Sequence, residues 1–195
     1  MNVILFDDDR ENLYPLSLTR PISDFRIGIS TIKEKWEFYY SDVSVKTDDY
    51  LSGKFPIKTK KNNLWINASV LPNKDLVTEI NSLRKGELLK KGEMVIAIHN
   101  HMFSTSKLDD IESHSIFNKI IDLCDIFSLN GEEIQNDFDR MITNKSNQFS
   151  KKQIEETNIK IGNNPIFIEK GAKVNHSILN TTTNDQQCFY TDLIA

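Results

Sequence analysis

The first nine residues of the chain limit its fold more than any other segment. Residues 1–6 (MNVILF) form an apolar run, and three aspartates, residues 7–9, follow it directly. A short apolar run without polar alternation is typical of a strand buried on both faces of a parallel sheet. Ligands commonly bind at the carboxyl ends of such strands. We therefore expect functional groups to gather after Phe6.

Helix-like and strand-like segments then alternate along the chain. Apolar residues recur at helical spacing in residues 28–40 and 72–83, and residues 64–66 (LWI) between them predict a second buried strand. Residues 87–98 hold two apolar runs around a glycine, which predicts a hairpin because glycine readily adopts positive φ. Helical spacing returns in residues 134–141. The order predicts an α/β domain with a Rossmann-like mixed sheet.

The composition is that of an ordinary water-soluble globule. Of the 195 residues, 38% are hydrophobic and 27% are charged, and the formal net charge is −4. That charge provides no basic surface for nucleic acid. Cys124 and Cys188 lack the spacing of a zinc site or a disulfide framework, and no apolar run is long enough to cross a bilayer. We expect a cytoplasmic protein without a nucleic-acid or membrane partner.

A change of composition marks the end of the first domain. We assign residues 1–143 to the α/β domain and the polar residues 144–158 to a linker. Short strand-like runs follow, in which the aliphatic residues Ile168 and Val174 stand six positions apart. That spacing is typical of a left-handed β-helix, of which residues 159–183 would be an incomplete start. Residues 184–195 lose the period and stay unassigned.

The three aspartates by themselves fit several classes of protein. A phosphoacceptor receiver domain also has acidic residues after its first strand, but Pro15 and Pro21 interrupt the helix that should follow. A dehalogenase-type phosphatase would use Asp7 as nucleophile and Asp9 as acid, but Arg10 and the residues after it do not continue that motif. Both classes therefore account for less of the chain than the similarity carried by residues 13–28.

Residues 13–28 carry a more extensive similarity. The stretch LYPLSLTRP (residues 13–21) resembles the Leu-x-Pro-Leu-Thr-x-x-x-Pro segment of sugar-1-phosphate nucleotidyltransferases. Residues 19–28 (TRPISDFRIG) and 34–37 (EKWE) are most similar to bifunctional N-acetylglucosamine-1-phosphate uridylyltransferase-like proteins. The order of the later segments also matches, so the resemblance spans residues 1–183. Here the combination of motifs is more specific than any one of them.

The resemblance implies a fold and a reaction. The expected fold is the nucleotidyltransferase α/β domain followed by a β-helix. The expected substrates are a nucleoside triphosphate and a sugar-1-phosphate, with Mg²⁺ as cofactor and pyrophosphate as product. Acyltransferase activity of the β-helix is not expected here, because the coils that would carry it are not in this chain. A homo-oligomer remains an open prediction.

Several groups that the family uses are replaced in this sequence. The Gly-rich loop, whose backbone N–H groups close around phosphates, reads Asp-Asp-Asp-Arg-Glu in residues 7–11. The lysine usual after the motif's proline is Ile22, and the metal-binding aspartate usual after the middle strand falls near Asn67. Three carboxylates repel a triphosphate unless cations lie between them.

Six residues remain as candidates for the site. Arg20 and Arg26 are the expected phosphate-binding residues, because guanidinium grips phosphate in two-point contacts. By resemblance, Asp7 and Asp24 would hold Mg²⁺, and Arg10 and Asn67 would contact the nucleotide. For Arg20, Asp24 and Arg26 the structural alternative is a local salt bridge that pins the loop.

Two functions from different classes therefore stay open. One is a sugar-1-phosphate nucleotidyltransferase with an unusual acidic loop. The other is a degenerate domain that only binds a sugar nucleotide or braces an oligomer. The replaced glycines, lysine and aspartate favour the second, whereas the retained Arg20, Asp24 and Arg26 favour the first.

Overall fold

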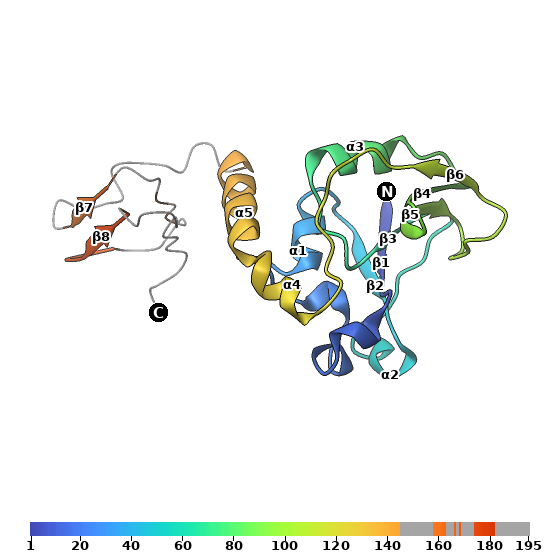
Figure 1. The fold of residues 1–195 in the computed structure, drawn as a ribbon, viewed down its shortest axis with the longest axis horizontal. Helices are drawn as coiled ribbons and strands as arrows, with labels where there is room; N and C mark the ends of the chain where they lie inside the picture. The colour runs from blue at the N-terminus through green and yellow to red at the C-terminus, as the bar shows by residue number, and fades with distance from the viewer. Residues whose placement is uncertain (145–157, 163–165, 167, 169–173, 182–195) are drawn as a thin grey trace. The chain divides into compact units, whose positions relative to one another are not determined.

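The computed structural model describes residues 1–144, 158–162, 166, 168 and 174–181. The chain divides into two compact units, Met1–Ile134 and Gln135–Ala195, and each is considered by itself. Figure 1 shows that the first unit is built around a sheet with helices beside it. Among the described helices, none combines the length and apolar character needed to cross a membrane.

The sheet of the first unit has six strands in the order β2-β1-β3-β5-β4-β6. The strands are β1 (Asn2–Phe6), β2 (Val43–Lys46), β3 (Asn63–Asn67), β4 (Glu87–Lys91), β5 (Met94–Asn100) and β6 (Asp109–Glu112). β1 runs parallel to both β2 and β3, whereas β5 runs antiparallel to β3 and to β4. The mixed α/β sheet predicted from the sequence is confirmed.

The central strand has the burial that its apolar run predicts. All five residues of β1 are buried. Val3 and Leu5 belong to the large core on one face of the sheet, and Ile4 and Phe6 to a smaller core on the other. A strand with apolar residues on both faces is stable only where both faces are covered, and β1 lies inside the sheet, between β2 and β3.

Helices and short turns connect these strands. They are the 3₁₀ turns η1 (Arg10–Leu13), η2 (Leu16–Leu18) and η3 (Ile22–Asp24), and the helices α1 (Ile32–Glu37), α2 (Asp49–Ser52), α3 (Lys74–Ser82), α4 (Leu123–Ser128) and α5 (Asn130–Asn144). Apolar residues of α1 and α3 join the large core. On the other face, Leu108 and the ring of Phe103 cover the smaller core.

The first helix is shorter than the periodicity of residues 28–40 predicts. Gly28 has φ 77°, and Arg26 and Thr31 form an antiparallel bridge, so residues 26–31 make a turn. Thr31 then starts α1 with a capping box, in which its side chain accepts from the Glu34 N–H and Glu34 accepts from the Thr31 N–H. The prediction was wrong at this end because capping decided the first residue of the helix.

Other local predictions are confirmed. The strand predicted at residues 64–66 is β3, and the helix predicted after Pro72 is α3, which Asn73 caps by accepting from the Leu76 N–H. β4 and β5 form the predicted hairpin, with Gly92 at φ 59°. The sequence did not indicate β2, β6, α2 or α4.

The second unit contains a pair of short parallel strands. β7 (Ile159–Ile161) and β8 (Ile178–Asn180) pair with Ile159 opposite Ile178. Much of the proposed β-helix start, and the linker from residue 145 to residue 157, lies outside the described residues. The left-handed β-helix and the predicted domain limits therefore stay predictions.

Candidate functional site

The carboxyl ends of β1, β2 and β3 meet at one edge of the sheet. Asp7 follows β1, Thr47 follows β2, and Asn67 ends β3. The turns after β1 and the helix α2 after β2 lie at this same end in Figure 1. The chain runs from β1 to β2 on one side and then crosses from β2 to β3 on the other side of β1. Because α/β proteins commonly bind ligands outside the strand ends at such a switch point, we refer to the space beside these three strand ends as the crevice.

Asp7 is bonded to three segments of the chain at this edge. One carboxylate oxygen accepts from the Ile22 N–H at 2.9 Å, and the other accepts from Thr47 Oγ1 at 2.6 Å and from the Arg10 guanidinium. Burial raises the pKa of Asp7, and these donors only partly offset it. Both oxygens are therefore already engaged within the protein.

Arg10 points back into the protein and away from solvent. It donates to Asp7, to the Ser17 carbonyl and to Tyr50 Oη, and its Nε lies 3.0 Å from Asp48 Oδ2. Burial by itself would lower the pKa of Arg10, but the bond to Asp7 and the surrounding charges raise it. Arg10 thus ties η1 to η2 and α2.

Asn67 is fully buried and has no unused hydrogen-bonding capacity. Its amide donates to Asp8 Oδ2 at 3.0 Å and to the Val95 carbonyl at 3.1 Å. Its oxygen accepts from both the N–H and the hydroxyl of Ser69. An aspartate at this position could not make the two donations, so the amide is required for this set of bonds.

Asp8 and Asp9 are less engaged than Asp7. Asp8 accepts from Asn67 through one oxygen. Asp9 has φ 53°, a 62% exposed side chain, and an ion pair with Lys119 at 3.7 Å. Lys119 comes from the connection between β6 and α4, and the sequence did not indicate it. Thr47 and Tyr50 were likewise missed, although the alternation of Val43 and Val45 could have revealed the strand before Thr47.

The segment with the predicted arginines lies against Asp7 through the Ile22 N–H. Arg20 is exposed and Asp24 is half-buried. Arg26 donates to the Ile29 carbonyl and lies 3.8 Å from Glu34, so it holds the turn before α1. Within the described part of the chain, no hydrogen bond or ion pair joins Arg20, Asp24 and Arg26, so the expected salt bridge among them is not formed.

The carboxylates at this edge are the groups that could hold a metal ion. No group of three or more His, Cys, Asp or Glu side chains arranged for a metal occurs among the described residues. Mg²⁺ is usually held by one or two carboxylates together with substrate phosphates, and it prefers oxygen ligands. One oxygen of Asp8 accepts no hydrogen bond from the part of the chain that the structure describes, so Asp8 fits that mode better than Asp7, whose oxygens are both occupied.

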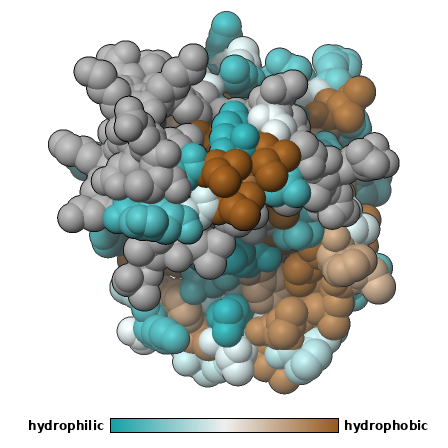
Figure 2. Space-filling view, turned by 90° about the vertical axis from the view of Figure 1, so that its left-hand side faces the viewer, coloured by the Kyte–Doolittle hydropathy of each residue, from teal (hydrophilic) through white to brown (hydrophobic). Residues whose placement is uncertain are grey.

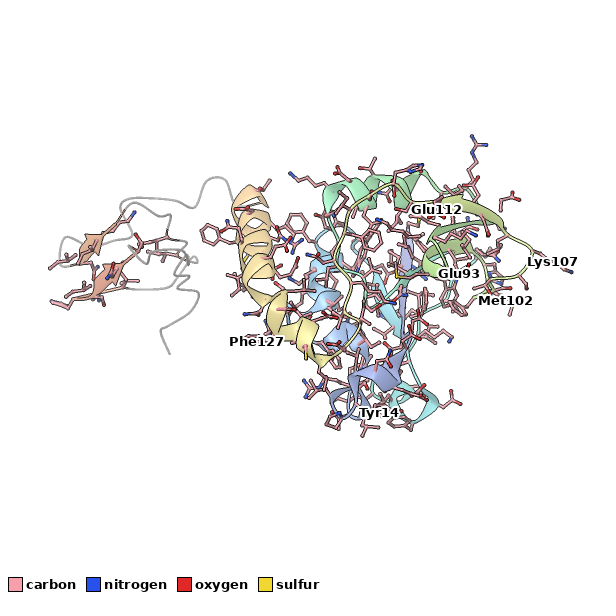
Figure 3. The ribbon with its side chains drawn as sticks, viewed as in Figure 1. Tyr14, Glu93, Met102, Lys107, Glu112 and Phe127 are labelled. Atoms are coloured by element: carbon pink, nitrogen blue, oxygen red, sulfur yellow. The ribbon has the colours of Figure 1, made fainter. Side chains whose placement is uncertain are left out.

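Apolar side chains lie exposed beside this edge. They are Tyr14, which directly follows η1, Leu16 and Leu18 of η2, and Tyr50 of α2. Figure 2 shows brown side chains at the lower end of the molecule, the end at which these turns lie. Tyr14 projects there in Figure 3, far from Met102 and Lys107 on the β5–β6 loop. The crevice edge therefore combines aspartates, one lysine and an apolar border.

The mixed sheet with helices beside it places the protein in the Rossmann-like α/β class, in which ligands commonly bind at the carboxyl ends of the strands. Comparison with known families makes this more specific. The family described as "Sugar nucleotidyl transferase" matches residues 3–146, which is most of the 195-residue chain. The chain belongs to this sugar nucleotidyl transferase family. Among curated proteins, none gives a significant match.

Proposed function

We propose that this chain transfers a nucleotidyl group from a nucleoside triphosphate to a sugar-1-phosphate and releases pyrophosphate. The observation that carries the proposal is the family match over residues 3–146, which includes every residue placed at the crevice. The geometry supports it, because the polar groups after β1, β2 and β3 converge at the switch point where α/β sheets bind nucleotides.

The site residues would act by position and charge, without a covalent intermediate. The sugar phosphate would attack the α-phosphorus in line with the departing pyrophosphate. Arg20, exposed and without an ion-pair partner in the described residues, is the proposed phosphate contact. Asp7 and Arg10 would position the loop that carries Asp8 and Asp9.

Mg²⁺ is the proposed cofactor, and the oxygen donors at the edge fit it. Asp8 is the proposed ligand, with Asp24 as the second carboxylate. The ion would offset the negative charge of the triphosphate. The role first expected for Asp7 as a ligand is better filled by Asp8, because the Asp7 oxygens already accept from Ile22, Thr47 and Arg10.

The substrate pair is the finer part of the proposal. The similarity to N-acetylglucosamine-1-phosphate uridylyltransferase-like proteins makes UTP with N-acetylglucosamine-1-phosphate the first pair to test. The other candidate function is a sugar-nucleotide-binding domain without turnover. One observation favours this binding function: Arg10 and Asn67, which were expected to contact the nucleotide, instead form hydrogen bonds to backbone carbonyls and stabilise the fold.

The decisive experiment measures pyrophosphate release from each nucleoside triphosphate, with Mg²⁺ and a panel of sugar-1-phosphates. Release should depend on both substrates, and Arg20→Ala and Asp24→Ala should lower it strongly. Arg84→Ala, which removes another exposed arginine, is the matched control and should leave the rate unchanged. If no pair gives pyrophosphate but a sugar nucleotide raises the melting temperature, the binding domain is the correct function.

A further inference from the structure

A late segment of the chain crosses the carboxyl edge of β3. The Leu71 N–H donates to the Asn118 carbonyl at 2.9 Å, and the Ile120 N–H donates to the Ser69 carbonyl at 2.8 Å. Lys119 lies between these bonds, in an antiparallel bridge opposite Val70. Two hydrogen bonds therefore hold the Lys119 backbone just beyond Asn67, although the two residues are far apart in the sequence.

The Lys119 side chain is largely covered but its ammonium is weakly engaged. Only 16% of the side chain is exposed, so its stem is held by neighbouring groups. The ammonium lies 3.7 Å from Asp9 Oδ2, which is longer than a hydrogen bond. Asp9 is its sole ion-pair partner among the described residues. An ammonium has three donors, so this lysine keeps capacity for an anion at the crevice.

Two arginines of the same region are already bound within the protein. Arg10 is buried against Asp7 and Asp48, and Arg26 is bonded to the Ile29 carbonyl and paired with Glu34. Ile22, which stands where the family usually has a lysine, is fully buried and apolar. A phosphate that approaches the loop of residues 7–9 would meet three aspartates. Lys119 lies within reach of that loop, and its ammonium is less engaged than the Arg10 guanidinium.

We propose that Lys119 is a phosphate-binding residue for the nucleoside triphosphate. Although it comes from a distant segment of the chain, it would supply the positive charge that a lysine in place of Ile22 would otherwise provide. The proposal rests on the proposed function of the crevice. When the triphosphate binds, the ammonium leaves Asp9 and donates hydrogen bonds to phosphate oxygens. These charge-assisted bonds are stronger than the 3.7 Å ion pair with the exposed Asp9 carboxylate.

The test compares variants of the full chain by calorimetry with Mg²⁺ and ATP, UTP, CTP, GTP, dTTP or inorganic pyrophosphate. Lys119→Ala should weaken binding about tenfold or more, since a hydrogen bond to a charged group is lost. Lys119→Arg should restore most of the affinity, and Asp9→Ala should not weaken binding. In turnover, Lys119→Ala should raise the KM for the triphosphate more than it lowers kcat.

Lys90→Ala is the matched control, because it breaks the Lys90–Asp110 ion pair on β4 and β6 without touching the crevice. If Lys119→Ala binds as tightly as the unchanged chain, or if Asp9→Ala loses as much affinity as Lys119→Ala, the lysine only pins the loop and the proposal is overturned. Those results leave the proposed function standing. If the unchanged chain binds neither triphosphates nor pyrophosphate, the proposed function fails and this inference fails with it.

Discussion

At the scale of single residues, Asn67 joins the ends of three segments through one amide. It donates to Asp8 and Val95 and accepts from Ser69, all in a fully buried position. An aspartate at this position would therefore destabilise the protein, because a carboxylate would face the Asp8 carboxylate and a carbonyl oxygen without a proton to share.

We expect Asn67→Asp to lower the free energy of unfolding by roughly 3 kcal/mol at neutral pH, through two lost donations and a buried repulsion. Urea denaturation measures this loss. The loss should shrink as pH falls, because burial and Asp8 raise the pKa of the new carboxyl and protonation removes the repulsion. Asn81→Asp is the control, since the Asn81 side chain accepts from Tyr40 Oη, a bond that an aspartate can also accept. Equal stability of the two variants would contradict the prediction.

A second prediction concerns Asp7 and the pH dependence of the free energy of unfolding. The pKa of Asp7 is raised above the ordinary value of 3.8, and burial is the largest cause. The folded chain therefore keeps the Asp7 proton at a pH at which the unfolded chain has already released it. Asp7 therefore adds stability below the unfolded-state pKa, and that contribution is lost as pH rises through the folded-state pKa.

The measurement is the difference in unfolding free energy between the unchanged chain and Asp7→Asn, taken at intervals upward from pH 3.8. Subtraction removes the effects of other carboxyl groups, such as Asp42 and Glu79, whose pKa values are lowered. The stability of the unchanged chain relative to Asp7→Asn should fall across this window. A relative stability that rises with pH would mean that Arg10 and Thr47 outweigh burial.

At the scale of elements, a buried ion pair links α1 to the start of α5. Lys35 Nζ lies 2.8 Å from Glu133 Oε2, and the two side chains are 0% and 3% exposed. Truncating one partner leaves the other charge buried, so Lys35→Met should cost about 3–5 kcal/mol of stability. The double variant Lys35→Met with Glu133→Leu should recover much of that loss, as a thermal denaturation cycle can show.

The exposed pair Lys33–Glu37 on the same helix is the control. These side chains are 35% and 42% exposed and 3.5 Å apart, so Lys33→Met should change stability by only about 0.5 kcal/mol. If Lys35→Met costs no more than Lys33→Met, the buried pair does not hold α1 and α5 together.

At the scale of the whole molecule, the crevice belongs to one compact unit. Asp7, Thr47, Asn67 and Lys119 all lie within Met1–Ile134. We expect a chain shortened after Asn144, which keeps all of α5, to unfold cooperatively and to bind the same nucleoside triphosphate with unchanged affinity. Calorimetry on both chains measures this. Lost affinity in a shortened chain that still unfolds cooperatively would show that residues after 144 contribute to the site.

Local pattern was enough to predict several elements. The apolar run of residues 1–6 predicted β1, the glycine between two apolar runs predicted the hairpin of β4 and β5, and Pro72 with helical spacing predicted α3. Each depends on periodicity or on a turn residue, which act over a few neighbouring positions. The motif of residues 13–28 likewise indicated the family from the sequence alone.

The tertiary structure decided which of those residues make the crevice. Sequence reasoning put Arg10 and Asn67 at the nucleotide, yet both are occupied in holding the fold, and it left out Thr47 and Lys119. Sheet order brings Thr47 beside Asp7, and the pairing of residues 118–120 with residues 69–71 brings Lys119 to Asp9. The periodicity of one segment predicts which of its faces is buried, but contacts between distant segments depend on strand order and register, which arise only when the whole sheet assembles.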